Sequence, residues 1–128
     1  MANELSMQLQ SLLRYTGVSD QYASGSKVVN QANQYFIKGI QNIGFAIWEA
    51  IDVGAEITIG NIGYTVFQNL DATNYVQIGV WTGAAFVPGQ RLLPGEISIS
   101  RWSQSLISLP YAYANTAAVN LFYTIYAD

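Results

Sequence analysis

The sequence predicts an all-β protein, a single antiparallel β-sandwich or jelly roll with a less regular N-terminal segment. Three observations support this fold class. Apolar and polar residues alternate with a period of two in short runs along most of the chain. Clusters of glycine, proline, asparagine and serine separate these runs. The runs follow one another at the close spacing that is typical of sandwiches and jelly rolls rather than of α/β folds.

The length of 128 residues corresponds to one domain. We expect residues 35–128 to form the body of the sandwich. Residues 1–34 are expected to form an opening strand followed by an extended loop or arm. No linker in the sequence indicates a second domain.

The strands of the body are predicted by alternation. They are expected at 35–43, 63–70, 75–80, 84–88, 97–101 and 118–127. The last of these runs carries apolar residues on both faces, because Phe122 and Tyr126 alternate with Val119, Leu121, Tyr123 and Ile125. A strand that is apolar on both faces is poorly suited to a sheet edge, so we expect this one to be central.

Turn signals join these strands. Thr82-Gly83 predicts a tight hairpin, and Pro94-Gly95 predicts a type II turn. Pro110 is interpreted as the end of a segment. Residues 45–54 are compatible with one helical turn or with a short irregular strand.

The first third of the chain is harder to interpret. Residues 3–17 fit a helix capped by Asn3 and ended by Gly17, but they fit equally well a strand with Leu5, Met7 and Leu9 on one face. Residues 18–33 are rich in serine, glutamine and asparagine, and we interpret them as a loop or extended arm.

Charge is scarce. Five basic and eight acidic residues make up 10% of the chain, against about 25% in typical globular proteins. Because a free monomer usually stays soluble through its charges, we infer that much of this surface is covered by other protein chains. The alternative is a monomer solubilised by its many uncharged polar residues.

Several partners and activities are not expected. The net charge of −3 and the scattered basic residues disfavour nucleic-acid binding, and the longest uncharged stretch is too polar for a membrane helix. The chain has neither cysteine nor histidine, which removes thiolate nucleophiles, the commonest general base and the commonest metal ligands. We therefore expect no enzyme activity, no cofactor and no metal.

Two groups of acidic and amide side chains are candidates for metal or catalytic sites. Glu49, Asp52 and Glu56 contain oxygen ligands that suit Ca²⁺, or a carboxylate pair for glycoside hydrolysis. We prefer a solvated acidic turn or an interface ion pair. Asp71 and Asn74 are expected to close their own turn through side-chain hydrogen bonds.

The aromatic residues are the strongest candidates for binding. They are Trp48, Trp81, Trp102, Tyr111 and Tyr113. Such residues suit a sugar-stacking platform, the filling of a core, or contact with another subunit. In a chain with so few charges we favour subunit contact.

Several segments resemble small virion structural proteins of tailed bacteriophages. They are QNIG (41–44), GYTVFQNLDATNYVQIGV (63–80), LLPGEISISR (92–101) and YAYANTAAVNLFYTIYAD (111–128). The opening MANELSMQLQSLLRYTG also looks like the first strand of such proteins, which favours a strand there. The resemblance implies a jelly-roll-like β-sandwich without a catalytic site. It also implies a role in capsid decoration or cementing, or another minor position in the head, neck, tail or fibre.

Taken together, we expect a non-enzymatic virion protein on the capsid surface, assembled in the host cytoplasm. It is expected to form a homo-oligomer, with a trimer implied by the resemblance, and to bridge subunits of the major capsid protein. The alternative function is a carbohydrate-binding β-sandwich module.

Overall fold

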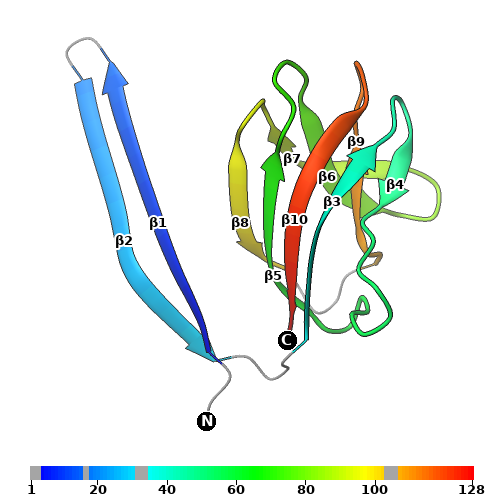
Figure 1. The fold of residues 1–128 in the computed structure, drawn as a ribbon, viewed down its shortest axis with the longest axis horizontal. Helices are drawn as coiled ribbons and strands as arrows, with labels where there is room; N and C mark the ends of the chain where they lie inside the picture. Colours follow the sequence, from blue (N-terminus) through cyan, green and yellow to red (C-terminus); the bar gives the residue numbers. More distant parts are fainter. Residues whose placement is uncertain (1–3, 16–17, 31–34, 103–106) are drawn as a thin grey trace. The chain divides into compact units, whose positions relative to one another are not determined.

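The computed structural model describes residues 4–15, 18–30, 35–102 and 107–128, and every regular element among them is a β-strand. The strands belong to two compact units, Met1–Asn33 and Gln34–Asp128 (Figure 1). The larger unit consists of two four-stranded antiparallel sheets. The prediction of an all-β sandwich is therefore confirmed.

The N-terminal unit is an antiparallel hairpin of β1 (Glu4–Tyr15) and β2 (Val18–Asn30). Its register shifts between Gln8 and Gln10, and Gly25 lies in this irregularity with a φ of 65°. A bulge of this kind favours glycine, because the left-handed region is costly for other residues. The strand favoured for the opening residues is confirmed. For residues 18–33 the sequence left a loop or an extended arm open. The loop is wrong for 18–30, because pairing with β1 holds this polar sequence in a strand; 31–33 lie outside the described residues.

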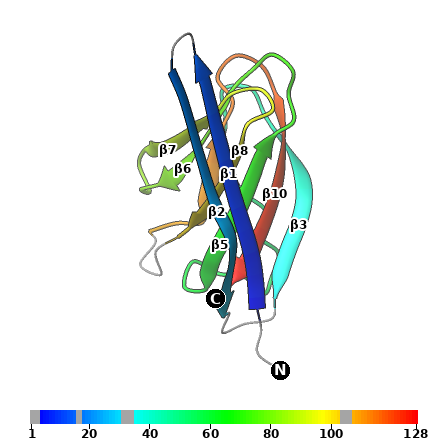
Figure 2. The same cartoon turned by 90° about the vertical axis from the view of Figure 1, so that its left-hand side faces the viewer.

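Within its described residues, 35–102 and 107–128, the body contains eight strands. They are β3 (Phe36–Ile43), β4 (Trp48–Ala50), β5 (Ile62–Asn69), β6 (Val76–Trp81), β7 (Phe86–Leu92), β8 (Ile97–Arg101), β9 (Pro110–Tyr113) and β10 (Val119–Ala127). The first sheet has the order β3-β10-β5-β8 and the second the order β4-β9-β6-β7 (Figures 1 and 2). β10 lies between β3 and β5, so its predicted central position is confirmed.

The strands of the body pair as in one long folded hairpin. β3 pairs with β10, β4 with β9, β5 with β8 and β6 with β7, all antiparallel. Two further pairings, β10 with β5 and β6 with β9, close the two sheets. The first and last strands of the body are therefore neighbours, and each sheet combines strands from both ends of this unit.

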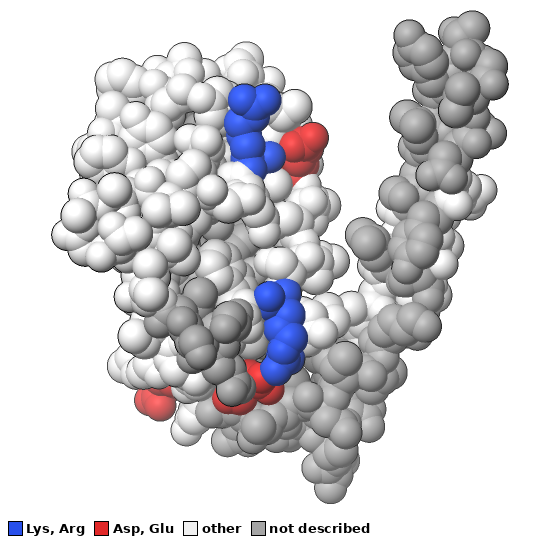
Figure 3. All heavy atoms as spheres, turned by 180° about the vertical axis from the view of Figure 1, so that it is seen from behind, with Lys and Arg blue, Asp and Glu red and all other residues white. Residues whose placement is uncertain are grey.

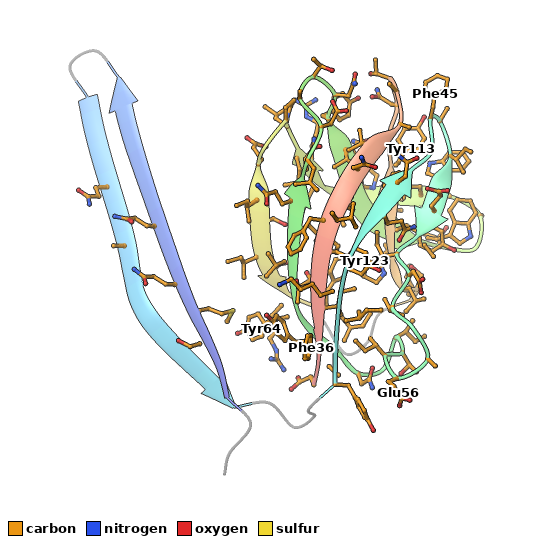
Figure 4. All side chains as sticks on the ribbon, viewed as in Figure 1. Phe36, Phe45, Glu56, Tyr64, Tyr113 and Tyr123 are labelled. Carbon is orange, nitrogen blue, oxygen red and sulfur yellow. The ribbon has the colours of Figure 1, made fainter. Side chains whose placement is uncertain are left out.

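The core lies between the two sheets. Alternate residues of β10 and β5 point into it, so that Leu121, Ile125 and Phe67 are fully buried. Tyr123 of β10 is also buried (Figure 4). Its hydroxyl donates a hydrogen bond to the backbone oxygen of Asp52, 2.8 Å away. Burial raises the pKa of Tyr123, and the Asp52 carboxylate raises it further. The hydroxyl stays neutral because charge is costly in this position.

Both predicted turns are present. Gly95 has a φ of 80°, and Glu96 N donates to Leu93 O at 3.0 Å, which is a type II turn around Pro94-Gly95. Thr82 N donates to Ala85 O at 2.9 Å in the hairpin between β6 and β7. These turns bring β6 beside β7 and carry the chain from β7 to β8.

One element differs from the sequence-based expectation, and one open alternative is decided by the structure. Pro110 begins β9 instead of ending a segment, because the first residue of a strand tolerates a missing N–H. In the uncertain stretch 45–54, the short-strand alternative holds, with β4 covering Trp48–Ala50. These two short strands pair with each other and carry part of the candidate site.

Candidate functional site

Aromatic side chains gather on the outer face of the second sheet. Tyr111 and Tyr113 alternate along β9 with the buried Pro110 and Ala112, so the tyrosines lie on the face turned away from the core. The register places Trp48 of β4 directly opposite Tyr113. The short strands β4 and β9 therefore hold large rings next to each other on one surface.

The rings of this surface contact one another. The centroids of Trp48 and Tyr113 are 5.7 Å apart with planes 21° from parallel, and those of Trp81 and Tyr111 are 6.0 Å apart at 25°. Trp48 also lies 5.6 Å from Trp81, and Phe86 lies 6.0 Å from Tyr113. All four distances lie in the range of favourable aromatic pairs; the first two pairs are stacked and the last two are tilted. We call this set the aromatic cluster: Trp48, Trp81, Phe86, Tyr111 and Tyr113.

Four of the five aromatic residues selected from the sequence are members of this cluster. Phe86 was missed, because its position opposite Trp81 depends on the pairing of β6 with β7. Trp48 is 49% exposed, while Trp81, Tyr111 and Tyr113 are partly buried against one another. The cluster is therefore a surface feature that ring–ring contacts hold in place.

Close packing of β6 against β7 supports the cluster. Gly79 pairs with Pro88 at a shift in the register. A Cβ built on Gly79 would lie 2.0 Å from the backbone oxygen of Val87, so close that the two atoms would overlap. Only glycine allows this approach. Trp81 and Phe86 pair two residues beyond this contact, at the end of the two strands. The close approach at Gly79 therefore helps to set the positions of these two rings.

The surroundings of the cluster carry little charge. Glu49 occupies an inner-face position between Trp48 and Ala50, and its Oε2 accepts a hydrogen bond from Gly44 N at 2.9 Å. Arg91, further along β7, lies over the ring of Tyr75, 5.0 Å from its centroid. Seen from behind, the described residues show only a few charged side chains (Figure 3). An uncharged aromatic surface is typical of the centre of a protein interface.

Trp102 does not belong to the cluster. It is partly buried and packs against the core, and its Nε1 donates a hydrogen bond to Thr65 Oγ1 at 2.7 Å. It lines a cleft of about 310 Å³ at the side of the sandwich, together with residues of β6 and β7 such as Val80 and Pro88. The structure therefore separates Trp102 from the other four predicted residues.

Glu49 and Asp52, two of the three acidic residues considered as metal ligands, bond to nearby backbone instead. Asp52 Oδ1 accepts a hydrogen bond from Gly54 N at 3.1 Å, so this carboxylate, like that of Glu49, bonds to nearby backbone. Within the part of the chain that the structure describes, no group of three or more acidic residues is placed to hold a metal ion. The same part contains no helix with the length and apolar character needed to cross a membrane.

The turn after β5 is organised by side chains, as expected for Asp71 and Asn74. Asp71 Oδ1 accepts from Thr73 N at 2.8 Å and from Asn74 N at 2.5 Å. These backbone hydrogen bonds, that of Thr73 first, hold the pKa of Asp71 below its ordinary value. The buried Asn69 donates to Asn74 O at 2.8 Å and to Leu92 O at 3.0 Å, and accepts from Asp71 N at 2.9 Å. This arrangement has a structural role.

A second apolar surface lies on the outer face of the first sheet. Phe36 and Ile40 of β3 are 63% and 64% exposed, and Ile97 and Ile99 of β8 are 60% and 40% exposed. Tyr64 and Phe36 lie at the same end of this sheet (Figure 4). The basic side chains here lie over rings, with Lys38 Nζ 5.8 Å from the Phe122 centroid and Arg101 5.2 Å from that of Tyr64.

A scan against protein-family models found no match, and neither a search of curated proteins nor a search of solved structures found one.

Proposed function

We propose that this protein is a non-enzymatic structural component of a bacteriophage virion, a capsid decoration or cement protein that associates with itself and bridges subunits of the major capsid protein. The carrying observation is that both sheets expose apolar residues on their outer faces. The aromatic cluster covers the second sheet, and residues such as Phe36, Ile40 and Ile97 cover the first. The virion, the capsid partner and the expected trimer come from the sequence resemblance.

In a free monomer, water would contact the apolar outer faces of both sheets. In a free antiparallel sandwich the outer face of each sheet is normally polar. Contiguous exposed apolar patches on soluble proteins mark interaction sites, and aromatic residues without neighbouring charges are enriched at interface centres. Burial of these faces against other subunits stabilises the assembly, because a bound partner shifts the equilibrium by mass action.

The strand order supports assigning the body to the jelly-roll type. Eight strands form two four-stranded sheets, and the nested pairing from β3 with β10 inward to β6 with β7 is that of a long hairpin folded over. Jelly rolls are common in viral capsid proteins and also in lectins. The fold is therefore compatible with the proposed role and with sugar binding. The two functions differ in the surface residues that they require.

The ring geometry favours protein contact over sugar binding. A sugar platform presents the open faces of aromatic rings to the ligand. In the aromatic cluster, Trp48 stacks on Tyr113 and Trp81 stacks on Tyr111, so the rings cover faces of one another. Carbohydrate binding remains the second candidate, because Trp48 is exposed and belongs to a row of rings.

The test is incorporation into particles. Virions are purified by density gradient from a host that produces the phage encoding this chain. Quantitative mass spectrometry should find the chain at a fixed ratio to the major capsid protein. A double variant, Trp48→Ala with Trp81→Ala, should lower this ratio at least tenfold, whereas Phe45→Ala, an exposed aromatic outside the stacked rings, should leave it unchanged.

Two results would overturn the proposal. One is the absence of the chain from purified particles. The other is retention of the purified protein on immobilised polysaccharide, lost in the tryptophan double variant and kept in Phe45→Ala, which would assign the cluster to carbohydrate binding.

A further inference from the structure

One edge of the first sheet offers an open row of backbone groups. β8 pairs only with β5 in the described part of the chain. Trp102 N donates to Gly63 O, and Asn69 N donates to Glu96 O. Since hydrogen-bonded and non-hydrogen-bonded pairs alternate along an antiparallel ladder, the even-numbered residues of β8, Ser98 and Ser100, direct their backbone groups toward β5.

The odd-numbered residues of β8 direct their backbone groups the other way. The N–H and C=O groups of Ile97, Ile99 and Arg101 point away from β5, and within the described residues no other strand meets them. The side chains of the same residues lie on the exposed outer face. β8 therefore presents a short strand edge whose exposed side chains are mainly isoleucine.

The other three edge strands are protected. β7 contains Pro88, which has no N–H to donate, and a register irregularity. β3 carries Lys38 in its middle, and a lysine at an edge discourages pairing. β4 is only three residues long. Because β8 has no charge before its last residue, Arg101, it is the least protected edge of the body.

We propose that β8 pairs antiparallel with β8 of a second copy of this chain, around a two-fold axis at Ile99. The pairing joins the two first sheets into one continuous sheet. This inference rests on the proposed self-association and adds the strand and the register through which two copies meet.

β8 is self-complementary in this register, both in its sequence and in which of its residues direct their backbone groups toward the open edge. With Ile99 opposite Ile99 of the second copy, Ile97 lies opposite Arg101 and Arg101 opposite Ile97. These are the residues whose backbone groups face outward, and each such pair exchanges two hydrogen bonds. No two like charges are opposed, because each Arg101 meets an isoleucine and already binds Asp128 of its own chain.

The inner face of the strand fits the same register. Ser98 lies opposite Ser100 of the second copy, in a non-hydrogen-bonded pair where side chains approach most closely. Ser98 Oγ is buried and has no hydrogen-bond partner among the described residues. Cross-strand serine pairs can form hydrogen bonds, so the pairing offers this hydroxyl a partner.

The pairing also explains the exposed isoleucines. Ile97 and Ile99 are 60% and 40% exposed in one copy, and the joined sheet places them in the middle of a surface shared by both copies. A two-fold contact adds to the three-fold contact expected from the resemblance, since an isologous interface joins copies in pairs. It therefore links neighbouring trimers, as a cement protein requires.

The first test changes the edge without changing the core. Ile99→Lys places two lysines opposite each other across the two-fold axis, and the mass measured by light scattering should fall twofold from that of the wild type. Ile59→Lys introduces the same charge at an isoleucine that is 43% exposed and lies in the loop between β4 and β5, outside both sheets, and it should leave the mass unchanged. Circular dichroism confirms that both variants are folded.

The second test addresses the register. Ile99→Glu alone should also halve the mass, and an equimolar mixture of Ile99→Glu and Ile99→Lys should restore it, because only the two-fold register places position 99 opposite itself. Hydrogen exchange should show that the amides of Ile97, Ile99 and Arg101 become protected as concentration rises. The amides of Ser98 and Ser100 should be protected at all concentrations.

The outcomes separate this inference from the proposed function. If Ile99→Lys leaves an oligomeric mass unchanged, the β8 contact is wrong and self-association uses another surface. If the mixture does not restore the mass, the two-fold register is wrong. A wild type that stays monomeric at high micromolar concentration overturns both the β8 contact and the proposed self-association.

Discussion

Trp48 and Tyr113 lie directly opposite each other on β4 and β9, with ring centroids 5.7 Å apart and planes 21° from parallel. β4 has only three residues and β9 only four, so few backbone hydrogen bonds fix their pairing. The ring contact adds to them, because stacked aromatic pairs contribute about 0.5–1.5 kcal/mol beyond their buried area. The exposed cluster therefore has a structural role in addition to the binding role proposed for it.

Truncating Trp48 should separate these two roles. Trp48→Ala should lower the free energy of unfolding by only about 1–2 kcal/mol, because the side chain is half exposed and loses mainly ring contacts. Urea unfolding measures this change, with Phe45→Ala as a control for the loss of an exposed aromatic ring. A loss above about 4 kcal/mol, the range of a buried tryptophan, would show that the residue belongs to the core.

Asn69 should matter more for stability than any other asparagine of the body. Its buried amide group makes three hydrogen bonds to backbone atoms of Asp71, Asn74 and Leu92. Asn69→Ala should lower the free energy of unfolding by about 3 kcal/mol, since buried polar groups left without partners are costly. Asn42→Ala removes an exposed hydrogen bond to Asn120 and should change stability by at most about 0.5 kcal/mol. Equal effects of the two variants in chemical denaturation would contradict this assignment.

The strands with strong alternation were predictable from the sequence, and those without it were not. β5 and β10 coincide with predicted runs within a residue, because one face of each is buried. β8 also coincides with its predicted run, but its isoleucines alternate onto the exposed face and none of its residues is fully buried. β2 is polar, and its strand conformation depends on pairing with β1. β9 could not be predicted, because Pro110 indicates the end of a segment. Its position as the first residue of a strand becomes evident only from the pairing of β9 with β4 and β6.

The candidate site was predictable in composition but not in geometry. Trp48, Trp81, Tyr111 and Tyr113 were predicted as candidates for subunit contact, yet no sequence pattern shows that three different strands bring them together. Trp102 has a similar sequence environment beside serine and nonetheless packs inward, because Thr65 offers its indole N–H a partner. The distinction depends on strand register, which is set by tertiary pairing.

Gly79 should not tolerate a side chain. A Cβ there would lie 2.0 Å from Val87 O, so Gly79→Ala must push β6 and β7 apart. We expect a loss of about 3 kcal/mol or more in thermal or urea unfolding. The control is Gly89→Ala, whose Cβ would lie at an ordinary 3.7 Å from Ile78 O and should change stability by less than about 1 kcal/mol. Similar stabilities of the two variants would show that the β6–β7 contact can relax.

The stability of the protein should fall at alkaline pH through Tyr123. Its pKa is raised above the ordinary 10.0, first by burial and then by Asp52. A raised folded-state pKa means that the contribution of the neutral hydroxyl is complete below pH 10 and is lost as the pH rises through the folded-state pKa.

The measurement compares wild type and Tyr123→Phe in urea between pH 7 and pH 11. At pH 7 the variant should be less stable by about 1 kcal/mol, because it lacks the hydrogen bond to Asp52 O. Above pH 10 this difference should shrink, since phenylalanine does not ionise. Tyr126→Phe, on the outer face of the same strand, is the control. A constant difference between wild type and Tyr123→Phe across this range would contradict the assigned cause.

The contrast between the core and the exposed face can be measured on two aliphatic residues. Leu121 is fully buried on the central strand β10, whereas Ile97 is 60% exposed on the edge strand β8. Leu121→Ala should lower the free energy of unfolding by about 2–5 kcal/mol, because it removes buried apolar contacts and leaves a cavity. Ile97→Ala should lower the stability of the isolated chain by less than about 1 kcal/mol.

In self-association the order of the two effects should be reversed, with Ile97→Ala having the larger one. Under dilute conditions where the wild type is monomeric, only Leu121→Ala should shift the urea midpoint. At higher concentration Ile97→Ala should weaken self-association measured by light scattering, because it removes apolar area from the outer face, while folded Leu121→Ala should associate as the wild type does. If Ile97→Ala destabilises the dilute monomer as strongly as Leu121→Ala, the outer face of the first sheet is covered within the chain itself, and its apolar residues are not available to a partner.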